Sequence, residues 1–168
     1  MSLVAVDTLI DEMAVGLSRL LEQRGVAEPA MVGIHTGGAW IADALHKKLQ
    51  LTQPLGLLDI TFYRDDFTRK GLHPSVKPSQ LPFVTEDQHI ILVDDVVMSG
   101  RTIRAAMNEL FDYGRPASVI LAALVTLPGR ELPIQPDIAG KAMDLSPRQR
   151  VKLAGPNPLS LELIDVDN

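Results

Sequence analysis

Uninterrupted apolar runs alternate with amphipathic segments along most of this chain. Residues 30–34, 89–93 and 118–127 are almost wholly apolar, and the last of these shows no two-residue alternation. Strands that are buried on both faces, as in a parallel sheet, have this character. The intervening segments carry apolar residues at helical spacing. Strands alternating with helices predict an α/β fold, a parallel sheet flanked by helices and joined by right-handed crossovers.

The first helix is the best marked. Apolar residues share one of its faces, the spacing of Thr8 and Asp11 resembles a capping box, and Gly25 is a suitable C-terminal stop. The sequence also predicts helices at about 39–49 and 102–113, and strands at 55–62, 151–153 and 159–164.

No repeat or low-complexity linker divides the 168 residues, so we expect one domain. Residues 63–88 contain three prolines, several charges and no sustained period. Long connections of this kind are often functional, and we expect a flexible lid there. The proline-rich tail, residues 129–168, is expected to form a small C-terminal hood.

Composition excludes several classes of function. The chain has no cysteine, which rules out a disulfide scaffold, a thiolate nucleophile and a zinc site built on sulfur. Its four histidines are scattered and lack the one-turn pairing of a helical metal site. A formal net charge of −5 gives no global attraction to nucleic acid. No apolar run approaches the roughly 18 residues of a membrane span, so we expect a cytoplasmic protein without membrane contact.

The segment 90–102, Ile-Ile-Leu-Val-Asp-Asp-Val-Val-Met-Ser-Gly-Arg-Thr, is the most informative part of the chain. We expect a buried strand that ends at Asp94 and Asp95 and a short loop that leads into a helix. In open α/β sheets, ligands bind at the carboxyl ends of the strands. Two adjacent carboxylates there can accept hydrogen bonds from a sugar diol or bind Mg²⁺.

The loop that follows the acids is suited to a phosphate group. A helix N-terminus offers unpaired backbone amides and the positive end of the helix dipole. Gly100 permits a close backbone approach, Ser99 and Thr102 add hydroxyl donors, and Arg101 adds positive charge. A phosphate at one end and sugar hydroxyls or Mg²⁺ at the other describe a phosphorylated sugar.

Other proteins also place acids after a buried strand. A P-loop hydrolase would need G-x-x-x-x-G-K-[ST], which is absent, and a receiver domain would place its acids near the N-terminus. The Asp-Asp pair alone favours an ordinary solvated strand exit, with Ser99 as a helix cap. The thirteen-residue string as a whole favours a ligand site.

This string closely resembles the phosphoribosyl-pyrophosphate (PRPP) motif of the type I phosphoribosyltransferases. The resemblance covers almost the whole chain and extends to the branch that regulates pyrimidine operons and also acts as a uracil phosphoribosyltransferase. The segments that carry it, besides the motif, are Met31-Val32-Gly33-Ile34, Asp59-Ile60-Thr61-Phe62-Tyr63-Arg64-Asp65-Asp66, Tyr113-Gly114-Arg115-Pro116, Arg130-Glu131-Leu132-Pro133-Ile134 and Gly140-Lys141.

The resemblance implies roles for individual residues. Asp94 and Asp95 would act in catalysis by holding the ribose 2′- and 3′-hydroxyls and by placing Mg²⁺ indirectly, through PRPP or water. Arg64 in the lid would lie over the leaving pyrophosphate. The implied substrate-binding residues are Thr36, Gly37 and Gly38 for pyrophosphate, Met98, Ser99, Gly100, Arg101 and Thr102 around the 5′-phosphate, Val96 and Val97 just before them, and Ile138 and Lys141 beside uracil.

The implied reaction converts uracil and PRPP to UMP and pyrophosphate with Mg²⁺, through an oxocarbenium-like transition state. The implied partners are PRPP, uracil, UMP and the mRNA leader of a pyrimidine operon, and the implied assembly is a homodimer or a dimer of dimers. Two alternatives remain open. One is an RNA-binding attenuator with little catalysis, and the other is a phosphoribosyltransferase that uses a purine base.

The chain departs from the family pattern at three places. The pyrophosphate loop of the family usually reads Lys-Thr-Arg-Gly, but here residues 35–38 read His-Thr-Gly-Gly, so an arginine that could bind phosphate in bidentate fashion is missing. Residues 97–99 read Val-Met-Ser where the family has Leu-Tyr-Thr, and the hydroxyl is kept. Gln135 stands where a basic residue is common, although the tail keeps other cations that could contact RNA: Arg130, Lys141, Arg148, Arg150 and Lys152.

Overall fold

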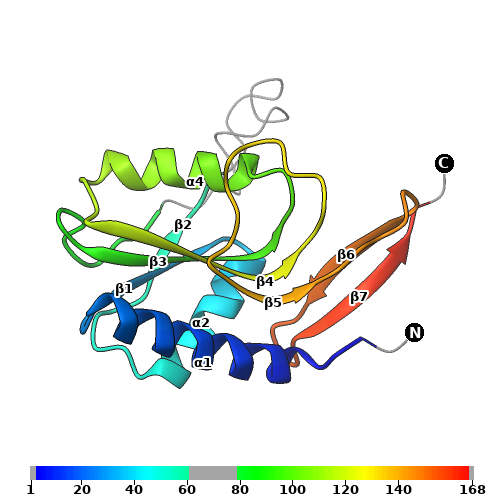
Figure 1. Cartoon of the computed structure of the whole chain (residues 1–168), viewed down its shortest axis with the longest axis horizontal. Coiled ribbons are helices and arrows are strands. Elements are labelled where there is room, and N and C mark those ends of the chain that lie inside the picture. Colours follow the sequence, from blue (N-terminus) through cyan, green and yellow to red (C-terminus); the bar gives the residue numbers. More distant parts are fainter. Residues whose placement is uncertain (1–2, 61–78, 167–168) are drawn as a thin grey trace.

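A five-stranded parallel sheet, in the order β2-β1-β3-β4-β5, forms the centre of the molecule (Figure 1). The computed structural model describes residues 3–60 and 79–166. Their elements are α1 (Val6–Arg24), β1 (Ala30–Ile34), α2 (Gly37–Leu49), β2 (Gly56–Leu58), β3 (His89–Val97), α4 (Arg101–Asp112), β4 (Ser118–Thr126), β5 (Ile138–Ala142), β6 (Gln149–Ala154) and β7 (Ser160–Asp165).

Helices cover both faces of the sheet, with α1 and α2 on one side and α4 on the other (Figure 1). Successive side chains of a strand point to opposite faces. In β3, Ile91 and Val93 therefore pack with α1 and α2, whereas Ile90 and Leu92 pack on the α4 side. The predicted α/β architecture with a parallel sheet is confirmed.

Several predicted boundaries differ from the structure. The first helix begins at Val6, and its N-cap Ala5 makes no side-chain cap, so Thr8 lies inside the helix and the predicted capping box is wrong. Gly25 ends this helix as predicted, with φ of 68°. The strand predicted over 55–62 is the short β2, and residues 61–62 lie outside the described part.

The strand that carries the two acids is longer than predicted. β3 continues through Asp94 and Asp95 to Val97, because β4 pairs with it as far as Thr126. The expectation that the strand ends at the acids is therefore wrong. The carboxylates lie within a paired strand, which fixes their backbone more firmly than a loop would.

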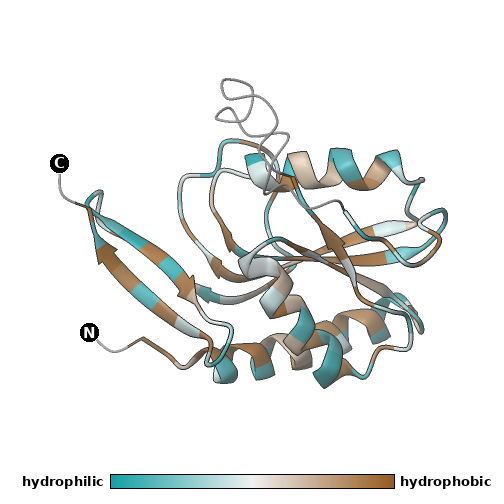
Figure 2. Cartoon of the chain, turned by 180° about the vertical axis from the view of Figure 1, so that it is seen from behind, coloured by the Kyte–Doolittle hydropathy of each residue, from teal (hydrophilic) through white to brown (hydrophobic). Residues whose placement is uncertain are grey.

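The C-terminal part of the chain contributes to two sheets. Ile138–Ala142, which the sequence analysis assigned to the hood, is the edge strand β5 of the main sheet. β6 and β7 form a separate antiparallel hairpin (Figure 1). Hydrophobic and hydrophilic residues alternate along this hairpin (Figure 2), and the buried side chain of Leu153 joins it to the core on the α1 side. Within residues 3–60 and 79–166, no helix is both long and apolar enough to cross a membrane.

Candidate active site

The carboxyl ends of β1 and β3 mark the point where the strand order reverses. From β1 the chain passes through α2 to β2 on one side, whereas β3 lies on the other side of β1. Ligands of open α/β sheets bind in the crevice at such a switch point. The loop between β1 and α2 and the loop between β3 and α4 both begin there.

The two acids of β3 have ordered backbone contacts. Asp94 is 5% exposed, and its Oδ1 accepts a hydrogen bond from the Asp95 amide at 2.9 Å. Asp95 is half-buried, and its Oδ1 accepts a hydrogen bond from the Val96 amide at 2.8 Å. A carboxylate oxygen has more than one acceptor position, and carboxylates are ligands that hard cations prefer.

The N-terminus of α2 packs directly against these acids. The helix begins at Gly37, two residues before the predicted start, and its N-cap Thr36 makes no side-chain cap bond. A Cβ atom on Gly38 would lie 2.7 Å from the carbonyl oxygen of Val93, so only glycine allows this approach of α2 to β3. A cavity of about 490 Å³ opens here, lined by Ile34, His35, Thr36, Gly37, Trp40, Asp94, Asp95, Val96, Thr102, Val151, Lys152 and Leu153.

The loop before α4 is a tight turn around a left-handed glycine. Its N-cap Gly100 has φ of 93°, a left-handed conformation that side chains other than glycine rarely adopt. Ser99 Oγ accepts a hydrogen bond from the Arg101 amide at 3.1 Å. A second cavity, of about 250 Å³, is lined by Val96, Val97, Met98, Ser99, Gly100, Thr102, Ile103 and Leu127.

The segment that follows β4 supports this loop from behind. The Ser99 carbonyl oxygen accepts hydrogen bonds from the amides of Glu131 and Leu132 at 3.0 and 3.1 Å. The Arg101 guanidinium forms an exposed ion pair with Glu131 at 3.1 Å. The Arg101 side chain therefore extends to this supporting segment, and Arg101 is not among the residues that line the 250 Å³ cavity.

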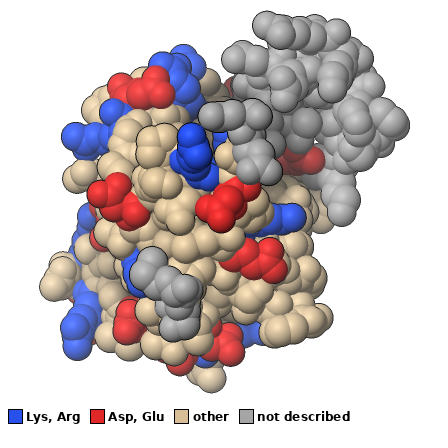
Figure 3. Space-filling view, turned by 90° about the vertical axis from the view of Figure 1, so that its right-hand side faces the viewer, with Lys and Arg blue, Asp and Glu red and all other residues tan. Residues whose placement is uncertain are grey.

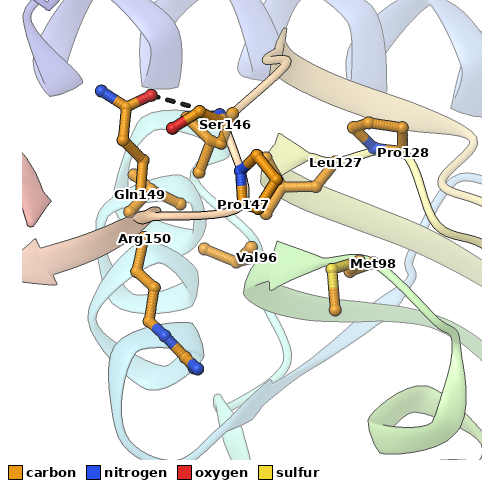
Figure 4. A pocket seen from close by; sticks show the side chains of 10 residues that line it. Val96, Met98, Leu127, Pro128, Ser146, Pro147, Gln149 and Arg150 are labelled. Atoms are coloured by element: carbon orange, nitrogen blue, oxygen red, sulfur yellow. Dashed lines mark hydrogen bonds between the residues drawn. The ribbon is translucent and has the colours of Figure 1, made fainter. Parts of the chain in front are cut away.

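A third cavity, of about 420 Å³, lies between the end of β3 and the hairpin (Figure 4). Val96, Met98, Leu127 and Pro128 line one side of it, and residues 145–147 and 149–151 line the other. Gln149 closes a tight turn here, because its Oε1 accepts from the Ser146 amide at 3.2 Å (Figure 4). Val96 lines all three cavities, which therefore lie next to one another around the end of β3, and we refer to them together as the hollow.

The structure brings most of the predicted residues to this hollow. Thr36, Gly37 and both acids line the 490 Å³ cavity, and residues 96–100 with Thr102 line the 250 Å³ cavity. Gly38 lies directly beneath, against Asp94. The predicted lid residue Arg64 lies outside the described residues.

Ile138 and Lys141 do not reach the three cavities. The Ile138 side chain packs toward α1, where its Cδ1 would lie 3.2 Å from a Cβ on Gly16, and Lys141 is opposite Val125 in the register of β4 and β5. Several residues outside the motifs also line the hollow and were not predicted from the sequence. These are Trp40, Ile103, Leu127, Pro128, residues 145–147, Gln149, Val151 and Leu153, while Arg150 and Lys152 were singled out only as basic residues of the tail.

Comparisons with known proteins decide the family. The model of the phosphoribosyl transferase domain family matches residues 5–144. The bifunctional protein PyrR of Pseudomonas syringae pv. syringae is 55% identical over 166 residues, which are 99% of this chain and 98% of that protein. The PyrR of Pseudomonas paraeruginosa is 60% identical over 162 residues, covering 96% and 95% of the two chains. This chain belongs to the PyrR branch of the phosphoribosyltransferases.

Solved structures agree with this membership at the level of the fold. A hypoxanthine-guanine phosphoribosyltransferase from Bacillus anthracis has a TM-score of 0.67 at 14% identity, over 85% of this chain and 83% of that one. A purine phosphoribosyltransferase from Pyrococcus horikoshii has a TM-score of 0.60 at 21% identity, over 80% and 84%. These neighbours share the parallel sheet and helices of the PyrR branch.

Proposed function

We propose that this chain transfers the phosphoribosyl group of PRPP to uracil, forming UMP and pyrophosphate. One observation carries the proposal: three neighbouring cavities share Val96 as a lining residue, around the end of the acidic strand. PRPP and uracil together have three corresponding parts, which are a 5′-phosphate, a ribose that bears pyrophosphate, and a base. Membership of the PyrR branch supports uracil as that base.

The 250 Å³ cavity is proposed to hold the 5′-phosphate. Amides in the first turn of α4 and the hydroxyls of Ser99 and Thr102 would donate hydrogen bonds to its oxygens. The left-handed Gly100 is the N-cap of this helix, and the segment around Glu131 supports the loop. Binding there would fix one end of the sugar and orient C1 toward the base.

The 490 Å³ cavity is proposed to hold the ribose and the pyrophosphate. Asp94 and Asp95 would accept hydrogen bonds from the two ribose hydroxyls, and the α2 amides would receive pyrophosphate oxygens. In the reaction the bond from C1 to the pyrophosphate oxygen breaks, a bond from C1 to uracil N1 forms, and the N1 proton is lost. Positive charge develops on the sugar, and the neighbouring carboxylates would stabilise it.

Mg²⁺ fits this donor set only together with the substrate. Among the described residues, no group of three or more His, Cys, Asp or Glu side chains could hold a metal ion. Asp94 and Asp95 supply hard oxygen ligands, and substrate oxygens and water would complete the coordination. The ion would neutralise charge on the departing pyrophosphate.

The 420 Å³ cavity is proposed as the site of the base. Apolar side chains from β3 and from the loop after β4 would contact the faces of the uracil ring, and the polar groups of residues 146–150 would meet its edge. This position replaces the expected one beside Ile138 and Lys141, because those residues lie away from the hollow.

A second function, binding of a pyrimidine-operon mRNA leader, is supported by kinship with proteins named bifunctional. The face that carries the hairpin shows acidic and basic side chains intermixed (Figure 3). A local cluster of tail cations would therefore have to provide the RNA contacts. We propose a homodimer or a dimer of dimers as the assembly that presents them, which sedimentation would test.

The test of the proposed function is a panel of bases. The protein is incubated with PRPP and Mg²⁺ and, in turn, with uracil, hypoxanthine and guanine, and nucleotide formation is measured. We expect UMP from uracil and no product from either purine. Product from a purine but none from uracil would show that the substrate is a purine and not uracil. Tight UMP-dependent RNA binding without turnover would show that the protein is a regulator.

A further inference from the structure

The hairpin strand β6 forms one wall of the 490 Å³ cavity. Val151, Lys152 and Leu153 line it together with the start of α2 and the acids of β3. Leu153 is 6% exposed and packs into the core, which fixes the position of β6. Lys152 is thus carried on an anchored strand, although it is distant in sequence from the α2 and β3 residues of the cavity.

The side chains around this cavity carry more negative than positive charge, which is unfavourable for binding a polyanion. Asp94 and Asp95 contribute two carboxylates. Among the described residues that line the cavity, Lys152 is the only lysine or arginine. The Lys152 side chain is exposed and makes no ion pair or hydrogen bond with any described residue, although Glu162 lies opposite it in the hairpin. No described residue therefore holds its ammonium group.

The start of α2 offers no cation of its own. Gly37 has no side chain, and a Cβ atom added there would collide with the carboxylate of Asp95. A diphosphate at the α2 amides would thus face carboxylates on one side without a lysine or arginine from its own loop, in which His35 is the one basic residue. Charge-assisted hydrogen bonds to phosphate are about twice as strong as neutral ones, so a nearby ammonium would matter.

We propose that Lys152 binds the pyrophosphate group and stabilises the negative charge that develops on it as it leaves the ribose. This inference rests on the proposed function, and it adds to that function a positively charged side chain at the pyrophosphate end of PRPP. An ammonium is a flexible point charge, so it can follow the oxygens as the bond from C1 breaks. This contact strengthens as the charge on pyrophosphate grows, which is the condition for lowering the barrier.

The test compares Lys152→Gln with Arg148→Gln. Arg148 is an exposed cation just before β6 that lines none of the three cavities, and its removal changes net charge equally. Calorimetry with Mg²⁺ and either inorganic pyrophosphate or UMP gives the two affinities. For Lys152→Gln we expect pyrophosphate to bind about tenfold more weakly, while UMP affinity changes by less than about twofold. Arg148→Gln should match the wild type, and Lys152→Arg should recover most of the loss.

Turnover gives the second readout. In the reverse reaction, Lys152→Gln should raise the KM for pyrophosphate and lower kcat, with the KM for UMP preserved. Unchanged pyrophosphate affinity, or an equal loss in Arg148→Gln, would overturn the assignment. Failure of the proposed function looks different, because the wild type would then form no UMP while the pyrophosphate calorimetry still reports on Lys152.

Discussion

The carboxylate of Asp95 lies where a side chain on Gly37 would begin. A Cβ atom on Gly37 would collide with Asp95 Oδ2 and lie 2.8 Å from its Cγ. Asp95 can therefore occupy this position only because residue 37 is a glycine. The carboxylate is also held by the Val96 amide, so a side chain at position 37 would have to displace it from that bond.

The first prediction follows from this contact. Gly37→Ala should lower kcat/KM for PRPP by about tenfold, because it moves Asp95 away from the position proposed for the ribose hydroxyls. Steady-state kinetics with varied PRPP measures the effect, and UMP affinity should fall as well, because UMP carries the same two ribose hydroxyls. Wild-type kinetics in this variant would show that the Asp95 position does not matter. The same collision leads us to expect that Gly37→Arg displaces Asp95 as well as adding a cation.

The second prediction concerns the proposed phosphate loop. Gly100→Val should abolish measurable UMP binding, because a β-branched residue is strained at φ of 93° and its Cβ would lie 3.2 Å from Ile134. Gly25→Val is the matched control. Gly25 has φ of 68°, a Cβ atom there meets nothing within 4 Å, and the residue lies outside the three cavities, so that variant shares the left-handed strain but keeps the loop. Equal UMP affinities in the two variants, measured by calorimetry, would remove the argument for a phosphate site.

Local sequence patterns were sufficient for the central elements. The apolar runs of β1, β3 and β4 and the amphipathic α1 and α4 carry their periodicity in consecutive residues. The acids and the loop to Thr102 were recognisable because one short segment holds them. The resemblance to a known family then placed residues 36–38 at the same site, and the structure brings them there.

Long-range contacts decided the features that the sequence did not reveal. β3 extends past its acids because β4 lies beside it, a pairing between residues about thirty positions apart. The edge strand β5 contains Gly140, whose missing Cβ makes room for Leu9 on α1 and for the Leu124 carbonyl, and no local pattern shows such a contact. Lys152 reaches the cavity only because Leu153 anchors the hairpin.

The third prediction concerns that anchor. Leu153→Ala removes a side chain that is 6% exposed, and it should destabilise the hairpin by about 2–4 kcal/mol. Because β6 carries residues of two cavities, turnover should fall together with protection of the hairpin amides in hydrogen exchange. Ile164→Ala is the control, since Ile164 is 40% exposed in the other strand. Full activity in a variant whose hairpin amides have lost protection would show that β6 does not contribute to catalysis.

The fourth prediction concerns RNA. The chain has a net charge of −5, so binding of a pyrimidine leader should be weak and depend on a few tail cations. Three or four phosphate contacts would lower the affinity roughly twentyfold to fiftyfold between about 50 and 200 mM salt on the single-strand slope. Filter binding at the two salt concentrations, with and without UMP, gives the slope. Tight binding that is insensitive to salt would contradict the expectation.

The most direct test of the central claim is the rate of UMP formation from labelled uracil and PRPP with Mg²⁺. It compares the wild type with the double variant Asp94→Asn, Asp95→Asn. The account predicts that the wild type forms UMP and that the double variant loses at least about a hundredfold in rate. Its melting temperature should stay close to that of the wild type, because removing adjacent like charges relieves repulsion. A wild type that makes no UMP, or a double variant that matches its rate, would contradict the account.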